Sequence, residues 1–116
     1  MGKVKDPLIL LDHILESIKL IEKYTENKTI DDFFSSPQIQ DSVMRRIEII
    51  GEAIKNISPE IKKQYSEMPW KEISGMRDIL IHEYFGVDLE LTWGVVVDDL
   101  PKLKANITEI KNKIKK

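Results

Sequence analysis

The chain contains no cysteine and only two histidines, His13 and His82. Without cysteine it has no disulfide bonds, no thiolate zinc site and no cysteine nucleophile, and this composition suits a reducing cytoplasm. The histidines and carboxylates are the remaining metal ligands, and no group of them has metal-binding spacing around His13. We therefore expect neither a metal nor any other cofactor.

Long hydrophobic runs are also missing. No apolar stretch approaches the ~20 residues that a membrane span needs, and the start MGKVKD lacks the apolar core of a signal peptide. No glycine-rich loop indicates nucleotide binding. A chain of 116 residues buries enough surface for one core. We expect a cytoplasmic protein with no membrane contact, folded as a single domain over residues 1–116.

An excess of positive charge is absent as well. The 18 Lys and Arg residues nearly balance the 20 Asp and Glu residues, so the formal net charge is -2. Proteins that coat nucleic acid usually carry a strong basic excess. The composition therefore disfavours a broad basic surface.

Proline residues mark where the helices begin. Asp6-Pro7, Ser36-Pro37 and Ser58-Pro59 each join a capping side chain to a proline, which is favoured in the first helical turn. Apolar residues then recur every three or four positions. The spacing predicts helices from Pro7 to near Asn27, over 37–57, 59–66 and 69–86, and from about residue 100 to the end, with a short turn or helical fragment in 29–36.

The stretch from Leu89 to Val97 is ambiguous, because its apolar residues alternate as they would in a strand. A lone strand would have no partner in an otherwise helical chain, so we favour a helix, with Pro101 at the start of the next helix or at a kink. The predicted fold is all-α, an up-and-down antiparallel bundle of four to five helices. Aromatic anchors for a core or interface are Phe33, Phe34, Trp70 and Trp93, and the C-terminal lysines are expected to form a frayed, solvated end.

The strongest candidate site lies in the run RDILIHEYFG at residues 77–86. Asp78 and His82 are one helical turn apart, so the carboxylate can accept a hydrogen bond from the imidazole and fix its tautomer. Arg77 and His82 are about 140° apart around an ideal helix. A compact site is therefore easier to build when a second copy of this helix faces the first.

These residue types suit RNA cleavage without a metal ion. A histidine can take a proton from a ribose 2′-hydroxyl or give one to the leaving oxygen. An arginine can hold the phosphate and stabilise the charge that builds up on its oxygens. The same residues are equally compatible with an ordinary surface or interface pair, Asp78–His82, and with salt bridges on a solvated face.

The segment around this motif is acidic. Between Arg77 and Asp99, Arg77 is the only Lys or Arg residue, against six carboxylates. RNA binding depends on neutralising backbone phosphates, so positive charge has to come from elsewhere. Arg45 and Arg46, on a helix expected to pack nearby, are the candidates for RNA-phosphate contacts.

Four segments together resemble one known family. RDILIHEYFGVD at 77–88, RRIEIIGEAIKNIS at 45–58, PW at 69–70 and DLP at 99–101 occur in the order and spacing of the HepT-like branch of the HEPN domain superfamily. The resemblance covers nearly the whole chain. It implies an all-α bundle that forms a homodimer through the motif helix.

The resemblance also implies residue roles. Many members of this branch are metal-independent ribonuclease toxins that act through an Arg-polar-x3-His motif, which Arg77, Asp78 and His82 match in full. Arg77 and His82 would be catalytic and Asp78 would orient the histidine. In type VII toxin–antitoxin pairs, a minimal nucleotidyltransferase antitoxin adenylylates a tyrosine two residues after that histidine, which is Tyr84 here.

The expected function is therefore an RNA endonuclease toxin. One alternative is a non-catalytic dimeric module that docks a minimal nucleotidyltransferase as its substrate or specificity subunit, through apolar residues such as Leu89, Trp93 and Val97. Another is a purely structural dimer with the Asp78–His82 pair at its interface.

Overall fold

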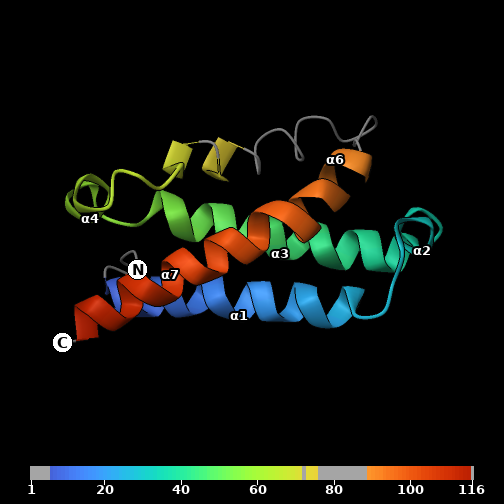
Figure 1. Cartoon of the computed structure of the whole chain (residues 1–116), viewed down its shortest axis with the longest axis horizontal. Coiled ribbons are helices and arrows are strands. Elements are labelled where there is room, and N and C mark those ends of the chain that lie inside the picture. The colour runs from blue at the N-terminus through green and yellow to red at the C-terminus, as the bar shows by residue number, and fades with distance from the viewer. Residues whose placement is uncertain (1–5, 72, 76–88, 116) are drawn as a thin grey trace, which may run out of the picture.

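The computed structural model describes residues 6–71, 73–75 and 89–115, and every element assigned in these ranges is helical. This confirms the all-α prediction (Figure 1). The elements are α1 (Pro7–Thr25), α2 (Ile30–Phe34), α3 (Pro37–Lys55), α4 (Pro59–Gln64), α6 (Leu89–Gly94), the π-helical turn η1 (Val95–Asp99) and α7 (Leu100–Lys115). Residues 70–71 and 73–75 are also helical.

The three helix starts that the prolines predict are confirmed. Asp6, Ser36 and Ser58 each accept a hydrogen bond from a backbone N–H of the first turn, and a proline follows each of them. The caps pair N–H groups that have no partner inside the helix, and the prolines remove one such N–H altogether. α1 ends just before Asn27, whose φ of 60° turns the chain toward α2.

The short helix α2 is held by side chains at its start. The Thr29 hydroxyl accepts from the backbone N–H of Asp32 at 3.1 Å, and the Asp32 carboxylate accepts from the backbone N–H of Thr29 at 2.9 Å. This reciprocal pair is a capping box, and the hydrogen bond from the Thr29 backbone holds the pKa of Asp32 below its ordinary value. The cap fixes a helix too short to persist alone, and Phe33 on it is fully buried.

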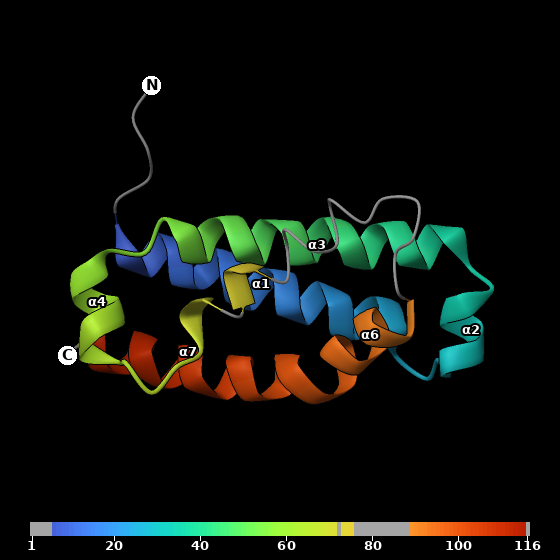
Figure 2. The same cartoon turned by 90° about the horizontal axis from the view of Figure 1, so that it is seen from above.

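α1 lies between α3 and α7 and packs against both of them (Figure 2). α3 runs back along α1, and α7 also runs opposite to α1, so the three long helices form an antiparallel bundle (Figure 1). Their apolar stripes meet in one core. Its fully buried members include Leu11, Ile14, Ile18 and Ile21 of α1, Val43, Ile50 and Ile54 of α3, and Ile107 of α7.

The ambiguous stretch is helical, which confirms the helix interpretation. α6 continues through the π turn η1 into α7, and the backbone N–H of Leu100 bonds to the carbonyl of Val95, five residues back. Pro101 has no N–H, and its ring would clash with the carbonyl of Val97 in a regular α-helix. A wider π turn before the proline accommodates both the missing N–H and the bulk of the ring, so the helix continues past Pro101 without a break.

The C-terminal end of α7 does not fray, so that part of the prediction is wrong, whereas Lys113 and Lys115 are exposed, as a solvated end requires. α7 stays helical through Lys115. The Lys111 ammonium pairs with the Asp12 carboxylate of α1, and Lys113 pairs with Glu109 and lies 5.6 Å from the centre of the Tyr65 ring. These contacts tie the last turns to α1 and to the segment after α4.

The core predicts a contrast between two isoleucines of α1. Ile14 is fully buried, whereas Ile9 is 43% exposed. Ile14→Ala should lower the free energy of unfolding by about 2–5 kcal/mol, because it removes buried methyl groups and leaves a cavity. Ile9→Ala is the matched control and should cost less than about 1 kcal/mol. Urea denaturation measures both, and equal losses would contradict the packing described here.

Candidate functional site

The four motif residues Arg77, Asp78, His82 and Tyr84 lie in residues 76–88, outside the described residues. Their predicted roles and the predicted dimer through that helix therefore stay predictions. The structure does describe how the chain enters and leaves this segment. On each side of it, a tryptophan anchors the backbone to the core.

Trp70 anchors the entry. Its side chain is 8% exposed, and its indole N–H donates to the backbone carbonyl of Tyr65 at 3.0 Å. This bond closes the turn between α4 and the helical residues that follow, and it pairs a polar indole group that burial would otherwise leave without a partner. Trp70 is a core anchor, as the sequence predicts.

Trp93 anchors the exit. It is half-buried on α6, and its ring lies 5.4 Å from the ring of Phe33 at an angle of 36°. This tilted aromatic pair holds α6 against α2. The other predicted anchor, Phe34, is 44% exposed and so is not part of the core.

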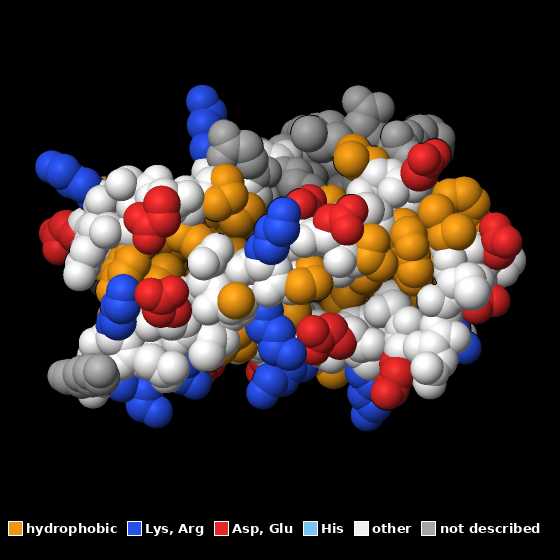
Figure 3. Space-filling view, in the orientation of Figure 1, with side chains coloured by type: hydrophobic (Ala, Val, Ile, Leu, Met, Phe, Trp, Pro, Cys, Tyr) orange, Lys and Arg blue, Asp and Glu red, His pale blue; other side chains and the backbone are white. Residues whose placement is uncertain are grey.

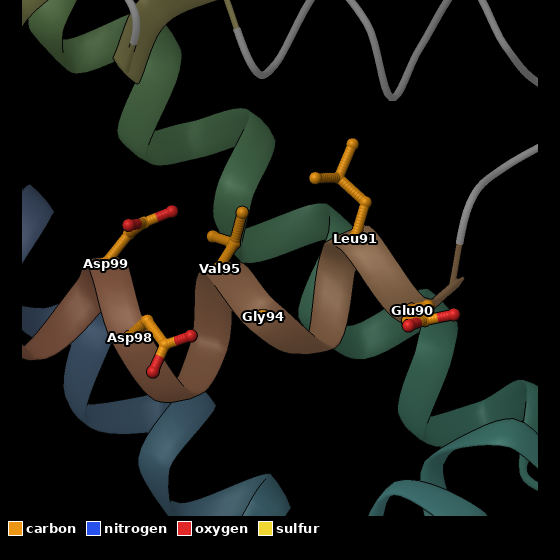
Figure 4. Close-up of a pocket in the computed structure, with 6 residues that line it drawn as sticks. All are labelled: Glu90, Leu91, Gly94, Val95, Asp98 and Asp99. Carbon is orange, nitrogen blue, oxygen red and sulfur yellow. The ribbon is translucent and has the colours of Figure 1, made fainter.

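Beside the exit, a concavity of about 530 Å³ is acidic. It is lined by Glu90, Leu91, Gly94, Val95, Asp98 and Asp99, and Figure 4 shows Leu91, Val95 and Asp99 projecting from the same side of the helix. Its described lining holds three carboxylates and no lysine or arginine, and these carboxylates repel a phosphate. This surface fits the acidic segment seen in the sequence and is a poor place for an RNA backbone.

Apolar surface is exposed at the same end of the molecule. Figure 3 shows orange side chains gathered where α2 and α6 lie. The exposed large apolar residues of α2, α6 and η1 are Phe34, Leu91 and Val97, each between 44% and 48% exposed. Of the residues that the sequence offered for docking, only Val97 belongs to this group, because Leu89 and Trp93 are half-buried against the core.

The two candidate arginines have different surroundings. Arg45 is exposed, and its guanidinium donates to the Glu48 carboxylate one turn later. Arg46 is half-buried and lines a concavity between α1 and α3 with His13, Glu16, Ser17 and Ile49. Successive residues point about 100° apart on a helix, so neighbouring arginines need not share a site.

His13 is exposed, and it shares a concavity with Arg46. The two residues belong to different helices, and all of α2 lies between them along the chain. The spacing of residues within one helix cannot predict that residues of two different helices lie near each other. Only the packing of α1 on α3 shows that His13 and Arg46 do.

The described ranges show neither a metal cluster nor a membrane-spanning helix. No group of three or more His, Asp or Glu side chains in them is placed to hold a metal ion. None of their helices combines the length and the apolar character of a membrane span.

Comparison with known proteins identifies the family. The family described as Ribonuclease HepT-like matches residues 14–110. A Methanocaldococcus jannaschii protein named "Gamma-glutamylcyclotransferase and putative RNase" is 61% identical over 97% of this chain and 50% of its own length. "Probable ribonuclease HepT" of Thermococcus cleftensis is 44% identical over 87% of this chain and 92% of its own.

A third relative, a "Putative RNase" of Caldanaerobacter subterraneus, is 39% identical over 97% of this chain and 100% of its own length. No solved structure matches the chain. The chain thus spans about half of the first of these relatives and nearly all of the other two. It is an all-α helical-bundle protein, and it belongs to the HepT-like ribonuclease family.

The entry anchor can be tested with a matched pair of variants. Trp70→Phe removes the indole donor, so the Tyr65 carbonyl keeps only its hydrogen bond from the Met68 backbone N–H, whereas Trp93→Phe breaks no hydrogen bond that the described residues make. Trp70→Phe should lower the free energy of unfolding by about 0.5–1.5 kcal/mol more than Trp93→Phe. Denaturant titration followed by circular dichroism compares them. A smaller loss for Trp70→Phe would show that this hydrogen bond does not anchor the entry.

Proposed function

We propose that this chain is a metal-independent RNA endonuclease and the toxin of a type VII toxin–antitoxin pair. Two observations support the proposal. The chain belongs to a ribonuclease family, and its sequence carries the whole Arg-polar-x3-His motif at Arg77, Asp78 and His82. The motif carries the argument, because these residue types can transfer protons and bind a phosphate without any other group.

The proposed reaction is a transesterification within RNA. The ribose 2′-oxygen attacks the adjacent phosphorus while His82 takes the 2′-hydroxyl proton. The bond from phosphorus to the 5′-oxygen breaks, and the leaving oxygen receives a proton from the His82 of a second copy. The products are a 2′,3′-cyclic phosphate and a 5′-hydroxyl. Arg77 binds the phosphate oxygens, and Asp78 holds the imidazole in one tautomer.

In the proposed pairing, a minimal nucleotidyltransferase inhibits the enzyme at Tyr84. The tyrosine oxygen attacks the α-phosphorus of ATP, AMP is transferred to it, and pyrophosphate leaves. The added phosphate places negative charge two residues after the catalytic histidine. Repulsion and bulk then keep the RNA phosphate away from Arg77.

The first test is RNA cleavage by the purified full chain in the presence of EDTA. Wild type should cleave RNA and leave 2′,3′-cyclic phosphate ends. His82→Ala and Arg77→Ala should each lower the rate by about 10²–10⁴-fold. Lys55→Ala, an exposed change on α3, is the control and should keep the wild-type rate. Unchanged cleavage by both motif variants, with folding verified by circular dichroism, would overturn the catalytic assignment.

The second test is modification by a partner nucleotidyltransferase with ATP. Mass spectrometry should find AMP on Tyr84 of the wild type, with loss of RNA cleavage. Tyr84→Phe should stay unmodified and remain active beside the partner. If the chain is modified but never cleaves RNA, the non-catalytic docking module is the correct function. If Tyr84→Phe is inhibited as strongly as wild type, inhibition does not act through this tyrosine.

A further inference from the structure

A second polar concavity lies where α1 packs on α3, with a volume of about 260 Å³. Its lining comes from both helices: His13, Glu16 and Ser17 of α1, and Arg46 and Ile49 of α3. The volume is several times the roughly 30 Å³ that one water molecule takes up in the liquid. The space can therefore admit a small charged group, and its charge balance decides which kind.

Arg46 is the principal charge in this concavity. Within the described part of the chain, its guanidinium takes part in none of the ion pairs or side-chain hydrogen bonds, whereas Arg45 beside it is paired with Glu48. A guanidinium presents five N–H donors in a planar fork that matches two oxygens of a phosphate. A half-buried arginine with its donors free is thus poised for an anion.

Ser17 supplies an independent observation. Its side chain is 1% exposed, and its hydroxyl is buried without a hydrogen-bond partner. Buried polar groups are nearly always paired, so an unpaired hydroxyl that lines a concavity calls for an explanation. A ligand oxygen at this place would accept the missing hydrogen bond.

His13 lies one turn before Ser17 on the same side of α1 and adds an N–H donor at the mouth of the concavity. Glu16 is the opposing group, because its carboxylate lines the same space and repels an anion. Three donor groups face one carboxylate, so the balance favours an anion over a cation. Removal of the Glu16 charge should therefore strengthen the binding of an anion and weaken the binding of a cation.

We propose that this concavity binds a backbone phosphate of RNA away from the bond that is cut, through Arg46, His13 and Ser17. The inference rests on the proposed function, which makes RNA the substrate. It also supplies positive charge for RNA binding, which the acidic segment around the motif lacks. The segment next to the motif presents the acidic concavity of α6 and η1, so the RNA backbone has to be held on another surface.

The test measures binding separately from cleavage. A fluorescent oligonucleotide with 2′-O-methyl groups cannot react, because its nucleophile is blocked, and fluorescence polarisation then reports affinity at several salt concentrations. Arg46→Met keeps most of the aliphatic packing and removes the charge. It should weaken binding about tenfold and lower the slope of log affinity against log salt by about 0.7, the value for one contact to a single strand.

Other variants sharpen the result. Glu16→Gln should strengthen binding, because it removes a negative charge beside the phosphate. Lys55→Ala removes one positive charge from α3 about 13 Å along the helix from Arg46 and should leave affinity within twofold. Ser17→Ala should weaken binding without lowering the melting temperature, because the hydroxyl has no partner in the free protein.

The outcomes separate this inference from the proposed function. If Arg46→Met and Lys55→Ala lower the affinity equally, the concavity is not the binding site. A lower affinity in Glu16→Gln would also contradict the proposal. AMP that competes as well as the oligonucleotide would assign the concavity to a free nucleotide and overturn the RNA assignment. Failure of wild type to cleave unmodified RNA counts against the proposed function, whereas failure to bind the blocked oligonucleotide overturns the inference itself.

Discussion

The packing of α1 on α3 is the contact on which the other elements depend. Both helices are 19 residues long and begin at a capped proline, and their stripes of isoleucine are fully buried where they meet. Each such side chain contributes about 1.5–3 kcal/mol when it leaves water. α1 in turn supports α7, so its two buried sides make it the central helix of the bundle. The polar concavity with Arg46 exists because this packing brings two helix surfaces together.

Charge is distributed unevenly over the described residues. α6 and η1 present carboxylates around one concavity, whereas Arg46 and His13 lie in another between α1 and α3. A net charge near zero thus conceals two surfaces of different character. Unlike a uniformly basic surface, such a distribution restricts where a polyanion can lie, because repulsion by the acidic surface narrows its path.

The fold was largely predictable because its signals are local. Asp6, Ser36 and Ser58 cap the helices that they precede, and the three- and four-residue spacing marks the buried stripes. Contacts between helices were not predictable. Lys111 pairs with Asp12 at the opposite end of the chain, and Arg46 and His13 line one concavity between two packed helices. The spacing of residues along the two helices does not indicate either pair.

For the candidate site, the sequence named residue types and the structure decided among some of them. Arg45 and Arg46 are equivalent in sequence, but one is paired with Glu48 and the other lines a concavity. The roles of Arg77, His82 and Tyr84 depend on residues 76–88, which lie outside the described ranges. For them the motif and the family remain the basis of the assignment.

The π turn before Pro101 determines which side of α7 faces the core. A turn closed five residues back holds one residue more than an α-helical turn, so it shifts the phase of everything after it by about 100° relative to an unbroken helix. Val95, Val96 and Leu100 before the proline and Leu103 after it are all buried. The inserted residue lets two apolar stripes of different phase lie on one continuous helix and face the same core. The number of residues in 95–99 therefore matters as much as their identity.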